Sequence, residues 1–150
     1  MKWEDHNEIE QLLFKYPEYA DTGNFEAVGA LFEHCEMIVP GQPNYRAPSA
    51  NAYTEYYAAW VRLFPDSGTP KTRHVISNIS IEYDGAPDRA KSRSYFSVFQ
   101  STDKLPLQPI VIGTYLDKFA KIDGKWRFIE RYEDMERKGD CREHLLIEWR

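Results

Sequence analysis

Three side chains in the first half of the chain are of types that accept, hold and donate protons. The stretch FKYPEYADTGNF contains Tyr16 and Asp21 at the end of a helical pattern, and His74 opens the stretch HVISNISIEY. Histidine is the natural general base near neutral pH, because its free pKa is about 6.5. A carboxylate bonded to one ring nitrogen fixes the tautomer and stabilises the imidazolium, which leaves the other nitrogen free to take a proton from carbon. Asp21 and His74 are therefore candidates for an acid–base pair.

Tyr16 is a candidate hydrogen-bond donor for the same chemistry. Its hydroxyl is neutral at pH 7 and can donate to a carbonyl or to a leaving oxygen. Tyr16 precedes Asp21 by about one and a half helical turns, so the two do not share a face of a straight helix. Pro17 removes one backbone donor, and the kink that this predicts near Phe14 would bring the two side chains closer in direction.

Each of these residues also has a purely structural interpretation. An aspartate before Thr-Gly-Asn is typical of a turn residue that bonds local backbone, although the helix macrodipole opposes a negative charge at Asp21. His74 alone is typical of a satisfied strand histidine, and Tyr16 of a core aromatic. The sequence leaves these alternatives open for each residue taken singly.

The N-terminal third of the chain has a helical pattern. Ile9, Leu12, Leu13, Tyr16 and Tyr19 follow the spacing of three and four residues that marks one helix face. Asn24 is predicted to cap a short second helix, CEMIVP to form a short strand, and PGQPNYRAPS to form a loop. Ser49 or Asn51 is predicted to open a third helix, which carries Tyr53, Tyr56, Tyr57, Trp60 and Leu63.

The period changes to that of strands from His74 onward. HVISNISIEY and RAKSRSYFSVFQ alternate on either side of a DGAPD turn, and LPLQP is predicted to interrupt the sheet. Two further strands meet at Asp123-Gly124, a strong hairpin signal, and the tail ERKGDCREHLLIEWR is predicted to close as a short helix. Helices followed by antiparallel strands indicate an α+β fold.

The first long strand has no cleanly polar face. One face carries His74, Ile76, Asn78 and Ser80, and the other carries Val75, Ser77, Ile79 and Ile81. A sheet with one face in water alternates more sharply. We therefore expect one face to line a helix-covered cavity and the other to pack on a second subunit.

The totals limit the classes of function. The 150 residues fit one domain, 1–150, and the 15% of aromatic residues can fill a core, line a cavity or form an interface. A net charge of −5 with dispersed Lys and Arg argues against nucleic acid as a partner.

The sequence also bears on where the protein works. No apolar run reaches the ~20 residues of a membrane helix, and the start of the chain is not typical of a secretory signal. Cys35 and Cys141 lie far apart in the sequence. A cytoplasmic protein is the simplest expectation. Phosphate-loop, dinucleotide, nucleophile-elbow and zinc motifs are missing, so no cofactor and no metal are expected.

Four segments, taken in order, resemble the SnoaL-like branch of the nuclear-transport-factor-two-like superfamily. They are YPEYADTGNFEAVGALF, TRHVISNISIEYDG, SYFSVF and GTYLDKFAKIDGKWRFIERY, within roughly Ile9 to Tyr132. The resemblance implies a cystatin-like cone, in which a curved antiparallel sheet wraps around N-terminal helices and encloses a mostly apolar pocket. It also implies a homodimer or homotrimer formed through the outer face of the sheet.

The resemblance also implies roles for individual residues. In the scytalone dehydratase, bile acid 7α-dehydratase and hexachlorocyclohexane dehydrochlorinase families, an aspartate ends the first helix and a histidine opens the first long strand, which matches Asp21 and His74. The bile acid enzymes also carry a catalytic tyrosine that falls on Tyr16 and a tyrosine that falls on Tyr115. Scytalone dehydratases have a second histidine where this chain has Gln100, so that dehydration is not expected here.

Together these observations predict a cofactor-independent lyase or isomerase that acts on a hydrophobic, cyclic or aromatic small molecule. The predicted catalytic residues are Asp21, His74 and Tyr16, and the predicted substrate-binding residues are Tyr115, Asn78, Tyr57, Trp60 and Phe96. Tyr115 can equally be a core aromatic, and Asn78 can orient substrate or bond backbone. Two alternatives remain open: a small-molecule-binding protein without chemistry, and a structural subunit that resembles the small chain of ring-hydroxylating oxygenases.

Overall fold

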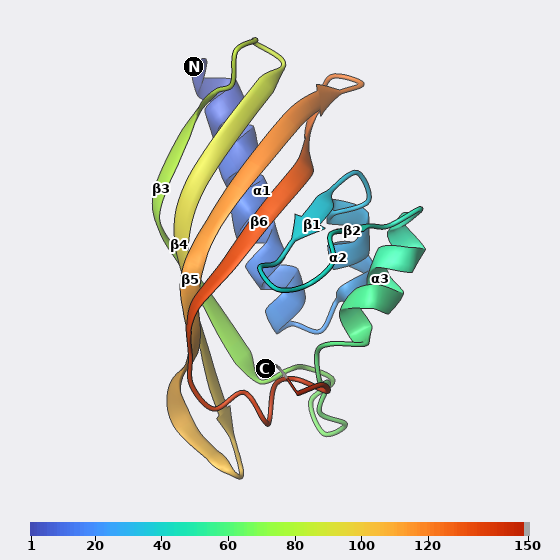
Figure 1. Ribbon diagram of the computed structural model, residues 1–150, viewed down its shortest axis with the longest axis vertical. Helices are drawn as coiled ribbons and strands as arrows, with labels where there is room; N and C mark the ends of the chain where they lie inside the picture. The colour runs from blue at the N-terminus through green and yellow to red at the C-terminus, as the bar shows by residue number, and fades with distance from the viewer. Residues whose placement is uncertain (149–150) are drawn as a thin grey trace.

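The computed structural model describes residues 1–148, and its helices all lie on the concave side of one curved sheet (Figure 1). The elements are α1 (Trp3–Asp21), α2 (Phe25–Leu31), β1 (Glu36–Ile38), β2 (Tyr45–Arg46), α3 (Ala50–Ala58), β3 (Thr72–Tyr83), β4 (Arg89–Thr102), β5 (Leu105–Ile122) and β6 (Lys125–Lys138). The predicted α+β fold, a curved sheet around N-terminal helices, is confirmed. None of these helices is both long and apolar enough to cross a membrane.

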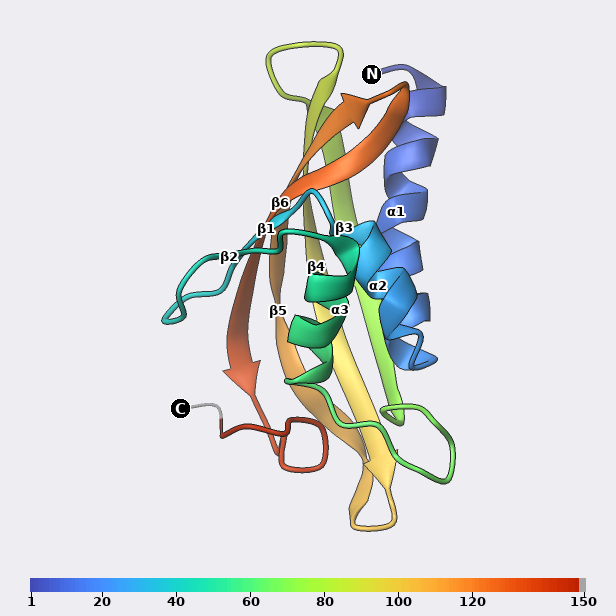
Figure 2. The same cartoon turned by 90° about the vertical axis from the view of Figure 1, so that its right-hand side faces the viewer.

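The strands form one sheet in the order β2-β1-β6-β5-β4-β3. All neighbours are antiparallel except β1 and β6, which pair in parallel. This pairing differs from the others because β1 enters the sheet from a helix rather than from a hairpin. Turned by 90°, the long strands form a wall with α1 along it and α2 and α3 beside it (Figure 2).

The first helix is fixed to the sheet at its N-terminal end by Asp5. The buried Asp5 carboxylate accepts hydrogen bonds from the Lys121 ammonium at 2.7 Å, the Tyr83 hydroxyl at 2.7 Å and the Trp126 indole at 2.8 Å. The bond from Lys121 contributes most to holding the pKa of Asp5 well below its usual range. With this end anchored, the buried stripe Ile9, Leu13, Tyr16 and Ala20 lies on the sheet. The last residue of α1, Asp21, then reaches the start of β3.

Several local predictions from sequence are confirmed. Asn24 and Ser49 cap α2 and α3, accepting hydrogen bonds from the backbone N–H groups of Ala27 and Ala52. Asp123 and Gly124 both have positive φ, at 49° and 77°, as a two-residue hairpin turn requires. Pro17 lies inside α1 without ending it, and the predicted kink stays a prediction. The short strand β2 was not predicted, because it lies within a proline-rich loop.

The predicted interruption at LPLQP is wrong. β5 begins at Leu105 and runs through Pro106 and Pro109 without a break. The register with β4 shifts between Val98 and Phe99, where Pro109 lies, and a bulge is one of the places where a sheet tolerates proline. The true turn precedes Leu105, where the Thr102 hydroxyl accepts bonds from two backbone N–H groups.

The predicted closing helix is also wrong for the residues that the structure describes. Residues 136–138 belong to β6, residues 142–144 form a turn, and residues 149–150 lie outside the described residues. Leu145 forms a bridge with Val61, and the Leu146 N–H donates to the Trp60 carbonyl at 2.9 Å. The segment therefore lies beside the chain that follows α3, where backbone partners are available (Figure 1).

A bulge in β3 explains the mixed faces of HVISNISIEY. The register with β4 shifts between Ser77 and Ser80, and Asn78 has a φ of 52°. One extra residue moves the following side chains to the opposite face, so Ile79 and Ile81 pack on the core although the pattern assigned them elsewhere. The predicted sharing of one face by His74 and Asn78 is therefore wrong. His74 is buried and Asn78 is exposed.

The left-handed backbone at Asn78 predicts the effect of substitutions there. We expect Asn78→Val to lower the free energy of unfolding by about 1–2 kcal/mol, because a branched Cβ is disfavoured at positive φ. Asn78→Gly should leave stability near that of the wild type, and the exposed Ser77→Val serves as control in urea titrations. A stable Asn78→Gly variant that had lost ligand binding would contradict this structural role.

Candidate functional site

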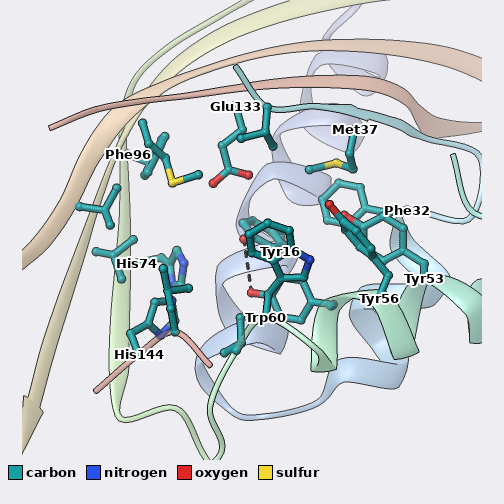
Figure 3. A pocket seen from close by; sticks show the side chains of 17 residues that line it. Tyr16, Phe32, Met37, Tyr53, Tyr56, Trp60, His74, Phe96, Glu133 and His144 are labelled. Carbon is teal, nitrogen blue, oxygen red and sulfur yellow. Dashed lines mark hydrogen bonds between the residues drawn. The ribbon is translucent and has the colours of Figure 1, made fainter. Parts of the chain in front are cut away.

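The candidate site is a cavity of about 110 Å³ between the helices and the sheet. Its walls come from α1, α3, β3 to β6 and the C-terminal segment, and most of the lining side chains are apolar (Figure 3). Among the polar side chains that line it are Tyr16, Tyr57, His74, Glu133 and His144.

The structure brings Asp21 and His74 together at the edge of this cavity. His74 Nδ1 lies 2.6 Å from Asp21 Oδ1, although 53 residues separate them in the chain. The second carboxylate oxygen accepts the backbone N–H of His74 at 2.8 Å, and Oδ1 also accepts the Thr72 hydroxyl at 2.8 Å. The two side chains are only 11% and 5% exposed. Three donors from the start of β3 therefore hold one carboxylate at the end of α1.

These donors determine the charge of Asp21. Burial by itself would raise the pKa of this carboxyl, but the hydrogen bonds from His74 and Thr72 outweigh it and lower the pKa below its usual value. The donors also offset the negative end of the α1 macrodipole, which would otherwise oppose the charge. Asp21 is thus ionised at neutral pH.

The ionised carboxylate fixes the tautomer of His74. A carboxylate can only accept, so Nδ1 of the imidazole must carry the proton that it donates to Asp21. In the neutral form of the ring Nε2 is then the nitrogen without a proton, and no residue that the structure describes donates a hydrogen bond to it. Since the ring of His74 lines the cavity, a basic nitrogen is available to a bound molecule.

Tyr16 lies beside this pair and forms a second polar group with Tyr57. The two hydroxyls are 3.4 Å apart (dashed line, Figure 3), and the Tyr16 ring meets the His74 ring edge-on with centroids 5.7 Å apart. Burial raises the pKa of both tyrosines well above the usual value. Both hydroxyls therefore stay protonated at neutral pH and are able to donate a hydrogen bond.

The predicted substrate-binding residues divide into two groups. Tyr57, Trp60 and Phe96 line the cavity, whereas Asn78 and Tyr115 do not. The Phe96 ring, which lines the cavity, stacks on the Tyr115 ring with centroids 4.1 Å apart, and substrate binding by Tyr115 stays a prediction. Gly113 opposite Phe96 makes this stacking possible, since a Cβ there would lie 2.8 Å from the Phe96 ring.

Behind the cavity, Tyr115 belongs to a buried cation site. The Arg131 guanidinium lies 4.0 Å from the Tyr115 ring centroid and 4.8 Å from that of Tyr16. Two of its nitrogens donate to the Asp117 carboxylate at 2.7 Å and 3.0 Å. Burial opposes the charge of Arg131, but the Asp117 carboxylate more than compensates and raises the pKa of the guanidinium. The Arg131–Asp117 pair therefore positions the rings of Tyr16 and Tyr115, which pack on the guanidinium.

Two titratable residues of the cavity were missed from the sequence. Burial raises the pKa of Glu133, on β6, despite the opposing charges of Arg131 and His74. Burial and the nearby His74 lower the pKa of His144 to about 4, so it is neutral at pH 7. Its Nδ1 has no hydrogen-bond partner among residues 1–148.

The sequence signals for these two residues were weak. Glu133 stands among other charged residues in ERYEDMERK, where a register shift hides which of them face inward. His144 has no carboxylate at a ligand spacing and lies in the segment that was predicted to be helical. Within residues 1–148, no group of three or more His, Cys, Asp and Glu side chains is placed to hold a metal ion.

Comparison with known proteins gives one family and many structural neighbours. Residues 1–132 match the family described as the SnoaL-like domain. A proposed scytalone dehydratase from Novosphingobium aromaticivorans is 26% identical with a TM-score of 0.70, over 90% of this chain and 86% of that one. No curated protein matches the sequence significantly.

Two further neighbours from Novosphingobium aromaticivorans share the fold. A protein described as NTF2-like with a cystatin-like fold is 21% identical with a TM-score of 0.73, over 92% of this chain and 86% of that one. The β subunit of a proposed aromatic-ring-hydroxylating dioxygenase is 19% identical with a TM-score of 0.63, over 87% and 90% of the two chains. At these identities the likeness concerns the cystatin-like fold alone.

Proposed function

Since the chain belongs to the SnoaL-like family, we propose that it is a cofactor-independent lyase or isomerase whose base is His74. The observation that carries the proposal is the 2.6 Å contact between His74 Nδ1 and Asp21 at the edge of an apolar cavity. His74 Nε2 removes a proton from carbon or from a hydroxyl group, and the Asp21 carboxylate stabilises the imidazolium that forms.

Tyr16 assists the same reaction as a hydrogen-bond donor. Its hydroxyl belongs to the Tyr16–Tyr57 pair and lies on the wall of the cavity near the His74 ring. A developing oxyanion, either an enolate or a leaving oxygen, accepts a hydrogen bond from a neutral phenol that burial has desolvated. In this proposal Tyr16 stabilises the transition state and stays protonated throughout.

The size and lining of the cavity support a small, hydrophobic, ring-shaped substrate. A volume of about 110 Å³ is below the ~300–1,000 Å³ of drug-sized pockets and closer to the ~150 Å³ of a cavity that holds benzene. The aromatic walls, among them Phe32, Phe96 and Trp60, suit a cyclic or aromatic ligand. The proposal is therefore restricted to single-ring compounds.

A proton-exchange assay tests the base directly. The protein is incubated with a neutral ring ketone that carries a β-hydroxyl group, 3-hydroxycyclohexanone, in D₂O. We expect deuterium to enter the carbon next to the carbonyl, followed by loss of water. Exchange no faster than in buffer would contradict the proposal.

The similarity to the dioxygenase β subunit supports a second candidate function. In that case the chain is a structural subunit, and its cavity has no catalytic role. It then co-purifies with a large iron-bearing partner and catalyses no exchange. A carrier of small apolar ligands without chemistry is the third alternative, and it retains ligand but forms no product.

The outer face of the sheet supports the proposal of a homodimer or homotrimer. Val75, Tyr95, Ile112 and Leu116 are each 40–46% exposed there, on the three adjacent strands β3, β4 and β5. Exposed apolar side chains that gather on one face are typical of an interface.

We expect Leu116→Arg to convert the oligomer into monomers, because a charge would be buried in the contact. Light scattering coupled to gel filtration measures the mass. Leu107→Arg is the control, since Leu107 is 74% exposed at the start of β5 next to the β4–β5 turn, five residues before Ile112. A wild-type protein that is monomeric at all concentrations would contradict the proposed interface.

Cys35 and Cys141 are both free thiols. Two unpaired cysteines support the proposal that the protein works in a reducing compartment such as the cytoplasm.

A further inference from the structure

We propose that Glu133 is the catalytic acid of this site, a carboxylic acid that hands its proton to the departing hydroxyl group while His74 removes a proton from carbon. This inference rests on the proposed lyase function and adds a second proton-transfer residue to it. It concerns a residue on β6, on a different wall of the cavity from Asp21 and His74.

The position of Glu133 suits this role. Figure 3 shows its carboxylate directed into the space between the side chains of Phe96, Tyr16 and His74. Among residues 1–148, no side chain or backbone group donates a hydrogen bond to this carboxylate. Glu133 is half-buried, and a carboxyl group that is partly removed from water and has no donors of its own is costly to ionise, so its hydrogen-bonding capacity is directed at whatever occupies the cavity.

The surroundings of Glu133 favour its protonated form. The charged and titratable groups that face it are Arg131 on β6, Asp117 and Tyr115 on β5, His74 on β3, Tyr16 on α1, and Tyr53, Tyr56 and Tyr57 on α3. Arg131 is the permanent cation in this set, and Asp117 already pairs with it through two hydrogen bonds. Burial therefore dominates and raises the pKa of Glu133.

The other polar groups of the cavity are less suited to deliver a proton. The pKa values of Tyr16 and Tyr57 are raised well above that of a free phenol, so these hydroxyls donate hydrogen bonds but give up protons poorly. His144, with a pKa of about 4, is a neutral imidazole at pH 7 and is not an acid that can protonate a leaving group. Among the lining residues that the structure describes, Glu133 is the one with a carboxyl group. A carboxyl group with a raised pKa is a suitable general acid.

His74 and Glu133 together account for both proton transfers of an elimination. His74 Nε2 takes the proton from carbon, and the C–H electron pair forms the carbon–carbon double bond. The carbon–oxygen bond breaks, and the leaving oxygen takes the Glu133 proton and departs as water. The site is left with an imidazolium and a carboxylate, and one proton passed from His74 to Glu133 through the product water restores the starting state.

The protonation of Glu133 can be tested without a substrate. A glutamate whose pKa is higher in the folded than in the unfolded protein binds its proton more tightly when folded. Its contribution to stability is therefore fully present below the unfolded pKa and is lost as pH rises through the folded pKa. Glu133→Gln removes this loss, because glutamine is neutral at every pH.

We expect the melting temperature of Glu133→Gln to match the wild type near pH 4 and to exceed it increasingly toward pH 8. Glu136→Gln is the matched control, since Glu136 is an exposed glutamate on the same strand. Parallel melting curves for Glu133→Gln and wild type across this pH range would overturn the proposal.

The catalytic role is tested with 3-hydroxycyclohexanone by following deuterium exchange and water loss separately. We expect Glu133→Gln to retain exchange, which needs His74 and Tyr16 but no proton from Glu133, and to release water more slowly by about 10²-fold or more, mainly through kcat. The alkaline limb of the pH–rate profile should also disappear. Unchanged water release in Glu133→Gln would overturn the role of Glu133 but leave His74 as the base. Absence of exchange in the wild type would instead overturn the lyase function and the role of Glu133 with it.

Discussion

The His74→Ala variant is expected to lose turnover by about 10²- to 10⁴-fold while it remains folded. The imidazole provides the basic nitrogen at the cavity, and the alanine variant has no group at this position that can take a proton. His34→Ala is the control, because His34 lies on the surface with a side chain that is 41% exposed. Turnover is measured with 3-hydroxycyclohexanone or a related ring ketone, and folding is checked by circular dichroism.

Asp21→Asn tests the same pair from its other side. Asparagine keeps the size of the side chain, but its amide can donate to Nδ1, which would move the imidazole proton to Nε2 and remove the base. We expect a loss similar to that of His74→Ala and a changed tautomer in the ¹⁵N NMR spectrum of the imidazole. Near-normal turnover in both variants, with a ring ketone that the wild type converts, would exclude the proposed mechanism.

The pH dependence of stability gives an independent check on Asp21. Its pKa is lowered in the folded protein, so its contribution to stability is present above the unfolded pKa and is lost as pH falls through the folded pKa. Asp21→Asn should therefore be less stable than the wild type at neutral pH, and the gap should narrow in acid. If the difference in free energy of unfolding between Asp21→Asn and the wild type stayed constant down to low pH, the ionised form of Asp21 would not be stabilised in the folded protein.

Removal of one partner of the Arg131–Asp117 pair is expected to have the largest effect on stability. We expect Arg131→Met to lower the free energy of unfolding by about 3–5 kcal/mol, because Asp117 is then left buried without its cation. Both side chains are at most 1% exposed, so water cannot replace the lost partner. Urea titration followed by tryptophan fluorescence measures the change.

A second variant separates the charge from the packing. Replacing both residues, Arg131→Met with Asp117→Val, removes the unpaired charge and should recover much of the loss, since well-packed apolar residues often replace a buried pair at little cost. The exposed pair Lys118–Glu130 is the control, and Lys118→Met should cost no more than about 1 kcal/mol. If Arg131→Met cost as little as Lys118→Met, the buried pair would not be the element that holds Tyr16 and Tyr115.

Local signals in the sequence were sufficient for most of the fold. The helix caps at Asn24 and Ser49 and the Asp123-Gly124 turn depend on residue types within a few positions of each other. The Asn24 cap and the turn were predicted correctly, and Ser49 was one of the two residues predicted to open α3. The resemblance of four segments to a known family gave the curved sheet and also the pairing of Asp21 with His74. The contact between those two residues connects the end of a helix with the start of a strand, positions that sequence patterns mark well.

Two of the wrong predictions, those for Asn78 and for LPLQP, share one physical origin, which is register. The bulge after Ser77 moved Asn78 out to solvent, and the shift near Pro109 let β5 run through a proline-rich stretch. A slip of one residue reverses which side chains face inward, and hydrogen bonds to a neighbouring strand decide where it occurs. Those bonds join residues far apart in the chain, so the periodicity of one strand does not contain them.

The sequence, with its resemblance to a known family, therefore determined the α+β architecture, most caps and turns, and the contact between Asp21 at the end of α1 and His74 at the start of β3. Only the tertiary structure decided what surrounds that pair: the stacking of Phe96 on Tyr115, the inward position of Glu133 and the return of His144 to the cavity. These features depend on burial and on contacts among distant strands. The same burial shifts the pKa values of Glu133 and His144, which their residue types alone do not predict.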